Sequence, residues 1–145
     1  MRQPDANRPS SQAGPAVGGR VLAGQPGGPI LVVEDDDDIR DFVQAILTDA
    51  GYSVVVAPNG AVALESVERE PPRAILLDMK MPIMDGWEFV QRYRQSVAAA
   101  APIIVMTAAH DARVRAAQVR AIDVLGKPFD LDELLAVVAR AIRAA

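Results

Sequence analysis

Five short apolar runs alternate with longer stretches in which apolar residues recur every three or four positions. The short runs are rich in Val, Ile and Leu and do not alternate apolar with polar residues. This pattern is typical of parallel strands that are buried on both faces. It predicts strands at residues 30–33, 53–56, 74–77, 103–106 and 122–125.

The stretches between and after these runs have the apolar spacing of amphipathic helices. Gly51 is expected to end the first helix, and the Pro71-Pro72 pair to end the second. The positions expected to face the core are Ile39, Phe42, Val43, Ile46 and Leu47 in the first helix; Val62, Ala63 and Val67 in the second; Trp87, Phe89, Val90 and Tyr93 in the third; Val114, Ala117 and Val119 in the fourth; and Leu131, Leu134, Leu135, Val138 and Ile142 in the last.

Five successive strand–helix units predict a doubly wound α/β fold with a five-stranded parallel sheet and right-handed crossovers. In the flavodoxin-like version of this (βα)5 fold the strand order is 2-1-3-4-5. Ligands then bind at the carboxyl ends of the strands, where the order reverses between the first and third strands. The residues that follow each strand are therefore the candidates for a binding site.

The first 28 residues differ in composition from the rest of the chain. They contain six Gly and four Pro, about 36% of the segment, which is above the ~25–30% that marks low complexity. We expect residues 1–28 to be a disordered extension and residues 29–145 to form a single folded domain.

Charge and composition exclude several classes of function. Residues 29–145 hold 12 Lys and Arg against 18 Asp and Glu, a net charge of −6, so direct binding of nucleic acid is not expected. No apolar run reaches the ~18 residues of a membrane span, so membrane insertion is not expected. The N-terminus lacks the apolar core of a secretory signal, which favours a cytoplasmic location. The absence of cysteine excludes disulfides and thiolate metal sites.

Polar residues with complementary chemistry follow four of the predicted strands. Glu34 and Asp35 follow the first strand, Asp78 the third, Thr107 the fourth and Lys127 the fifth. Three carboxylates at one sheet edge repel one another unless a cation neutralises them, and oxygen ligands suit Mg²⁺. A hydroxyl and an ammonium opposite them would suit the oxygens of a phosphoryl group. Asp78, from the middle strand, is then the expected nucleophile that forms an acyl phosphate.

The acidic run continues beyond Glu34 and Asp35 through three further aspartates. Asp36, Asp37 and Asp38 are expected to begin the first helix, where carboxylates cap free backbone N–H groups and are favoured by the helix dipole. The run is therefore interpreted as two site residues, Glu34 and Asp35, followed directly by the start of a helix.

Four segments together resemble the signatures of the response-regulator receiver domain of two-component signalling. They are ILVVEDDDDIR, AILLDMKMPIMDGWEF, VMTAA and GKPFDLDELL, beginning at residues 30, 74, 105 and 126. The resemblance spans residues 29–143 and implies the fold predicted above. It also implies that the chain is a phosphorylation-controlled switch rather than a conventional enzyme, although a receiver catalyses its own phosphorylation and slow dephosphorylation.

The resemblance implies a role for each site residue. Asp78 would be the phosphoacceptor, and Glu34 and Asp35 would hold Mg²⁺ together with Asp78 and the backbone carbonyl of Lys80. Thr107 would hydrogen-bond the phosphoryl group. Lys127 would ion-pair with it, ahead of a cis Lys127–Pro128 bond.

The chain departs from the family pattern at two positions. Val124 stands where receivers usually carry Tyr or Phe, and Arg120 stands where a small residue is common. Both lie in the last two units, which usually form the output face, so the effect of phosphorylation there is open. His110 is expected to be an exposed loop residue rather than a phosphodonor, and Trp87 to be a packing residue.

The leading hypothesis is a stand-alone receiver, similar to chemotaxis regulators, that signals by binding a partner. Its expected partners are a sensor histidine kinase or histidine phosphotransfer protein, a downstream protein target, and a second copy of the chain in a weak homodimer. A phosphate sink without conformational output is an alternative. A pseudo-receiver that acts only as a binding module is disfavoured, because it would require loss of an active-site residue and all five are present. A haloacid-dehalogenase-like phosphohydrolase is disfavoured because it needs an acid two residues after the nucleophile, where this chain has Lys80.

Overall fold

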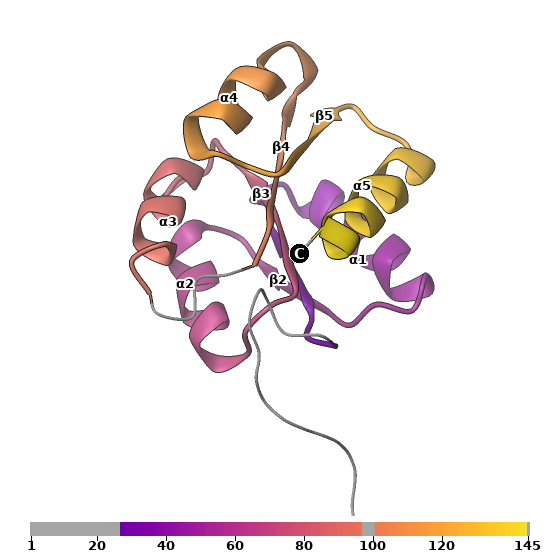
Figure 1. Ribbon diagram of the computed structural model, residues 1–145, viewed down its shortest axis with the longest axis horizontal. Coiled ribbons are helices and arrows are strands. Elements are labelled where there is room, and N and C mark those ends of the chain that lie inside the picture. Colours follow the sequence, from indigo (N-terminus) through magenta and orange to yellow (C-terminus); the bar gives the residue numbers. More distant parts are fainter. Residues whose placement is uncertain (1–26, 97–100, 145) are drawn as a thin grey trace, which may run out of the picture.

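The computed structural model describes residues 27–96 and 101–144 and contains one five-stranded sheet (Figure 1). All neighbouring strands pair in parallel, in the order β2-β1-β3-β4-β5, as predicted. The strands are β1 (Ile30–Val33), β2 (Val54–Ala57), β3 (Ala74–Asp78), β4 (Ile103–Ala108) and β5 (Asp123–Lys127). The expected disordered extension lies outside the described residues, apart from residues 27 and 28.

Helices cover both faces of the sheet, and each face has its own apolar cluster. The helices are α1 (Asp37–Asp49), α2 (Gly60–Arg69), α3 (Gly86–Tyr93), α4 (Ala112–Val119) and α5 (Leu131–Ala144), with a short 3-10 turn, η2 (Ala109–Asp111), before α4. Helices α1 and α5 pack on one face, and α2, α3 and α4 pack on the other (Figure 1).

The burial of β1 explains why its sequence shows no alternation. Leu31 and Val33 belong to the cluster under α2, α3 and α4, whereas Ile30 and Val32 belong to the cluster under α1 and α5. All four are almost completely buried. A strand with helices on both sides must be apolar at every position, as the pattern of residues 30–33 indicates.

The ends of the first helix follow from its sequence. Asp36 is the N-cap, and its side chain accepts a hydrogen bond from the backbone N–H of Ile39 at 3.0 Å. The helix ends at Asp49 with Ala50 as its C-cap, and Gly51 follows with φ +101°, a conformation that glycine adopts without strain. The predictions for Gly51 and for the aspartates at positions 36–38 are confirmed.

Several predictions about apolar positions in the last two units are wrong. Leu131, expected to face the core, is 47% exposed at the start of α5. In α4, Ala112, Ala116 and Val119 are buried, while Val114 is 59% exposed and Ala117 is exposed. The buried residues lie four and then three positions apart and so share one helix face, but this helix is too rich in Ala and Arg for apolar contrast to identify it. Strand β5 begins at Asp123, so that Ile122 lies outside it and is 45% exposed.

Small shifts also occur elsewhere. Strand β2 begins one residue later than expected, at Val54, and ends at Ala57.

Within the described residues, no helix combines the length and apolar character that crossing a membrane requires.

Candidate functional site

The side chains predicted from the sequence converge at the carboxyl edge of the sheet. Glu34 directly follows β1, Asp78 and Lys127 are the last residues of β3 and β5, and Thr107 lies near the end of β4. Strands β3, β4 and β5 run in parallel in adjacent positions, so their ends meet. Glu34, Asp78 and Thr107 are all at least 94% buried, which is unusual for carboxylates and demands compensating contacts.

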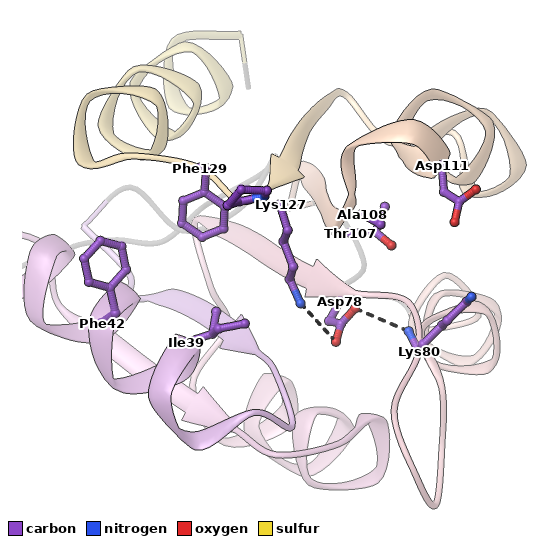
Figure 2. A pocket seen from close by; sticks show the side chains of 10 residues that line it. Ile39, Phe42, Asp78, Lys80, Thr107, Ala108, Asp111, Lys127 and Phe129 are labelled. Atoms are coloured by element: carbon purple, nitrogen blue, oxygen red, sulfur yellow. Dashed lines mark hydrogen bonds and ion pairs between the residues drawn. The ribbon is translucent and has the colours of Figure 1, made fainter.

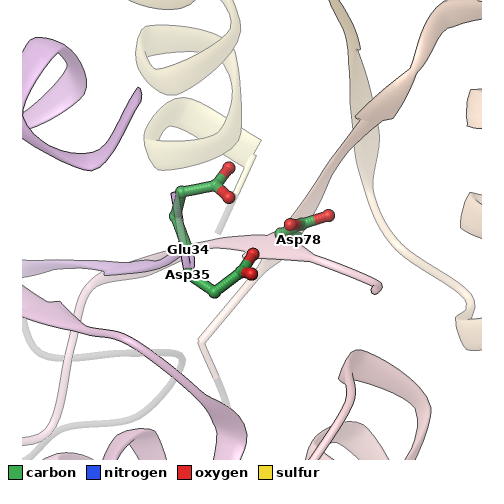
Figure 3. A group of neighbouring side chains, drawn as sticks. All are labelled: Glu34, Asp35 and Asp78. Carbon is green, nitrogen blue, oxygen red and sulfur yellow. The ribbon is translucent and has the colours of Figure 1, made fainter. Parts of the chain in front are cut away.

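Three carboxylates form a cluster between β1 and β3 (Figure 3). Glu34, Asp35 and Asp78 each offer an oxygen, and these oxygens lie within 4.8 Å of one another. Asp35 is exposed, so the cluster opens to solvent on its side. Negative charges this close favour a cation between them.

Lys127 partly neutralises this cluster. Its Nζ lies 2.8 Å from Oε1 of Glu34 and 3.5 Å from Oδ2 of Asp78, and Figure 2 shows the side chain reaching from β5 toward Asp78. Burial disfavours the charged form of Lys127, but the two carboxylates outweigh burial and raise its pKa. The ammonium is therefore held charged at the floor of the site.

Glu34 is the least solvated of the carboxylates. Burial raises the pKa of its carboxyl group from 4.5 to about 7; Lys127 opposes this rise and the charge of Asp78 adds to it. Oε2 accepts a hydrogen bond from the backbone N–H of Asp36 at 3.2 Å. Oε1 is buried, and its polar contact within the described residues is the ammonium of Lys127, 2.8 Å away.

The backbone of Glu34 is fixed by the first helix. Nη1 of Arg40 donates to the Glu34 carbonyl oxygen at 3.0 Å, and Nη2 pairs with the carboxylate of Asp37. One arginine thus connects the end of β1 to the first turn of α1. The same arginine therefore contacts both parts of the acidic run, the site residue Glu34 and the helix residue Asp37.

The loop after Asp78 is held by glycines at two helix starts. The backbone N–H of Gly86 donates to the Met79 carbonyl at 3.0 Å, and that of Gly60 donates to the Met84 carbonyl at 3.0 Å. A Cβ on Gly86 would lie 2.8 Å from Cα of Met79 and 2.9 Å from the carbonyl oxygen of Asp78. The sequence reasoning did not assign either glycine a role, although both follow Asn or Asp at a helix start.

A cavity of about 520 Å³ opens over Asp78 (Figure 2). Of the predicted site residues, Asp78, Lys80, Thr107 and Lys127 line it, whereas Glu34 and Asp35 do not. The backbone N–H of Lys80 donates to Oδ1 of Asp78 at 3.4 Å. The cavity is lined by Ile39, Phe42, Asp78, Lys80, Thr107, Ala108, Asp111, Lys127, Pro128 and Phe129. The cavity therefore has an ionic floor, formed by Asp78 and Lys127, and an apolar rim, formed by Ile39, Phe42, Pro128 and Phe129.

The apolar rim was not predicted as part of the site. Phe42 was expected to face the core, but it is 46% exposed and lines the cavity beside Phe129, with ring centroids 6.4 Å apart. Helical spacing places Phe42 near the buried face of α1 but cannot show that the β5–α5 segment stops short of covering it. The Lys127–Pro128 peptide bond in that segment is cis, as the resemblance implies.

The donor set fits a hard divalent cation. The clustered atoms are all carboxylate oxygens, two of the three carboxylates are buried, and the third is open to solvent. Mg²⁺ characteristically binds through a few such oxygens and keeps several waters. These residues therefore suit Mg²⁺ better than a transition metal, which favours nitrogen or sulfur ligands.

The unusual residues of the last two units have local roles. His110 is 82% exposed in the turn before α4, and its Nε2 lies 3.5 Å from Oδ2 of Asp111. Arg120 ends α4 with φ +52°, and its backbone N–H bonds to carbonyls of the preceding turn. Val124 lies within β5 and is half-buried.

Comparisons with known proteins agree with this geometry. Residues 30–139 match the family model described as the response regulator receiver domain. The DNA-binding transcriptional regulator NtrC of Escherichia coli K12 is 41% identical over 117 residues, which are 79% of this chain but only 25% of NtrC. This chain thus spans about a quarter of the length of that relative.

Two solved structures of response regulators match over almost their full length. The crystal structure of a putative response regulator from Chloroflexus aurantiacus superposes with a TM-score of 0.74 at 32% identity, covering 80% of this chain and 98% of that one. The chemotaxis response regulator CheY4 of Vibrio cholerae gives a TM-score of 0.72 at 32% identity, with coverages of 79% and 98%.

Proposed function

This chain belongs to the response regulator receiver domain family, and from that premise we propose that it is a phosphorylation-controlled switch whose phosphoacceptor is Asp78. Receiver domains are signalling switches rather than conventional enzymes. The proposal is therefore about which residues accept the phosphoryl group and how the rest of the chain responds.

The position of Asp78 is the observation that carries the proposal. It ends the middle strand, lies 94% buried beneath an open cavity and has Lys127 Nζ 3.5 Å from one carboxylate oxygen. A carboxylate oxygen of Asp78 would attack the phosphorus of a phosphohistidine. The new O–P bond forms as the P–N bond breaks, and the histidine leaves with the electron pair of that bond. Lys127 would neutralise a phosphoryl oxygen.

Other residues would position the transferred group. The Thr107 hydroxyl lies in the same cavity and would donate to a phosphoryl oxygen. Glu34, Asp35, Asp78 and the Lys80 carbonyl would hold Mg²⁺. When bound, this ion would neutralise phosphoryl oxygens and so favour transfer to an anionic acceptor.

The proposed partners follow from this chemistry. The phosphodonor would be a sensor histidine kinase or a histidine phosphotransfer protein in the cytoplasm. The phosphorylated chain would bind a downstream protein and form a weak homodimer. Small phosphodonors such as acetyl phosphate would also label Asp78, because the residues that stabilise the phosphoryl group belong to this chain.

A phosphate sink is a second candidate because of Val124. This half-buried residue lacks the aromatic ring whose movement usually reports phosphorylation, so acceptance of phosphate without a distal response is a coherent alternative. The two candidates share the acceptor chemistry and differ in whether the structure responds.

Labelling with acetyl phosphate and Mg²⁺ tests the acceptor. The wild-type chain should form an acid-stable, alkali-labile adduct, measured by intact mass, and Asp78→Asn should abolish it. Asp38→Asn is a matched control, since it removes an exposed carboxylate near the site in the first turn of α1. Strong labelling of Asp78→Asn at Asp36 or Asp37 would refute the assignment.

A further inference from the structure

The only tryptophan of the chain connects α3 to α4. Nε1 of Trp87, in the first turn of α3, donates to Oε1 of Gln118 at 2.9 Å. The guanidinium carbon of Arg115 lies 4.9 Å from the centroid of the indole ring, which is within the range of a cation–π contact. Both partners belong to α4, so a movement of that helix would change two contacts of the indole.

Arg115 also connects the indole to the cavity over Asp78. Its Nη2 lies 3.6 Å from Oδ2 of Asp111, and Asp111 lines the cavity that contains Asp78 and Thr107 (Figure 2). A continuous path of contacts therefore runs from the cavity through Asp111 and Arg115 to Trp87.

Arg115 makes few polar contacts. Its side chain is only 19% exposed, yet Nε has no hydrogen-bond acceptor within the described residues, and its ion pair with Asp111 is long. A half-buried guanidinium with an unused donor is held by charge and ring contact rather than by a closed hydrogen-bond network.

The two ends of α4 are held differently. At the C-terminal end, Arg94 of the α3 C-cap donates through Nη1 to the Val119 carbonyl and through Nη2 to the Arg120 carbonyl at 3.2 Å. At the N-terminal end, Asp111 occupies the cap position but its side chain makes no capping hydrogen bond. The N-terminal turn, which is nearer the cavity, is therefore the end of α4 that can shift.

We propose that Arg115 is the residue that transmits the phosphorylation state of Asp78 to the contact between α3 and α4. This inference rests on the proposed function, in which Asp78 accepts the phosphoryl group. The acyl phosphate replaces one carboxylate charge with about two phosphoryl charges and three acceptor oxygens. The added charge repels the Asp111 carboxylate in the same cavity and attracts the Arg115 guanidinium.

Both effects disturb the arrangement that places Arg115 over Trp87. The Asp111–Arg115 pair is only partly solvated, so a nearby charge changes its energy more than it would in bulk water. Because Arg94 holds the C-terminal end of α4, the response is a shift of its first turn. The populations of two positions of this turn change, and Trp87 reports the change. This path does not need an aromatic residue at position 124.

The single indole N–H cross-peak in a ¹H–¹⁵N spectrum provides the test. Beryllofluoride with Mg²⁺ serves as the phosphoryl probe, and ¹⁹F NMR measures its occupancy. Saturation should shift the Trp87 cross-peak in the wild-type chain. Arg115→Gln should reduce this shift to the level of Asp78→Asn, while ¹⁹F NMR still shows bound probe. Arg113→Gln, an exposed arginine on the same helix, should keep the full shift.

A second variant guards against a local folding defect in Arg115→Gln. Asp111→Asn keeps the guanidinium over the ring but removes the charged link to the cavity, so it should also lose the shift at full occupancy. An unchanged shift in both variants would overturn the role of Arg115, as would an unmoved indole in the saturated wild-type chain. Either result leaves the proposed function standing, whereas absence of Asp78-dependent probe binding would refute the proposed function itself.

Discussion

The buried carboxyl group of Glu34 makes the stability of the metal-free chain depend on pH in an unusual direction. Its pKa is about 7 in the folded chain, against an ordinary value of 4.5. Between these pH values the folded chain keeps a proton that the unfolded chain has released. Linkage then requires that the free energy of unfolding fall as the pH rises through this window.

The size of the effect follows from the two pKa values. Their difference corresponds to a free energy on the order of 3 kcal/mol, at ~1.4 kcal/mol per pKa unit. The stabilising contribution is complete below pH 4.5 and is lost once the pH exceeds about 7. Between pH 5 and pH 8, Glu34 should therefore lower the free energy of unfolding by roughly 2–3 kcal/mol.

Urea unfolding in the presence of EDTA, followed by the fluorescence of Trp87, measures this loss. The comparison is between the wild-type chain and Glu34→Gln, each at pH 5 and at pH 8. Glutamine keeps the shape of the side chain but has no proton to release, so the variant should lack this part of the pH dependence. Lys127 stays charged at both pH values, so its loss of a partner cancels from the difference.

Addition of Mg²⁺ provides an independent check. If the ion binds the deprotonated cluster, it should stabilise the wild-type chain more at pH 8 than at pH 5, since binding at the lower pH must first remove the Glu34 proton. Equal pH dependence in wild type and Glu34→Gln would show that Glu34 is not the group that holds the proton, and the reasoning would fail.

Three further predictions concern the loop, the metal and the switch. Gly86→Ala should destabilise the chain by about 1–3 kcal/mol in urea unfolding, because the new Cβ meets backbone atoms of Met79 and Asp78 that cannot yield; unchanged stability would show that the loop adapts. Asp35→Asn should weaken Mg²⁺ binding in calorimetry by at least about tenfold, and unchanged affinity would put the ion elsewhere. Thr107→Ala should still accept phosphate on Asp78, but beryllofluoride should cause smaller amide shifts in residues 106–112 and 124–130; full-sized shifts would remove Thr107 from the response.

The sheet and the ionic floor of the site were predictable because both depend on where strands end. Buried parallel strands leave apolar runs in the sequence, and the polar residue after each run must lie at the carboxyl edge. Asp78, Thr107 and Lys127 were located in this way. Their chemical roles stay predictions until labelling and binding are measured.

Contacts between helices were not predictable from the same pattern. The face of α4 that carries Arg115 and Gln118 cannot be chosen from a sequence of Ala and Arg, so the contact with Trp87 left no signal. Phe42 obeys helical spacing and yet lies at the cavity rim, because its exposure depends on how much of it the segment around Phe129 covers. The raised pKa of Glu34 likewise depends on complete burial, which position in a strand does not reveal.

The division of the core by the sheet has a consequence for how this chain can diverge. The cluster under α1 and α5 and the cluster under α2, α3 and α4 share no residue. Substitutions that are well separated and have no common partner change stability additively. Substitutions in one cluster can therefore accumulate without compensating substitutions in the other. The surfaces of the two helix layers can then change their binding partners independently. Only the strand ends that carry the ionic floor are constrained by changes on both faces.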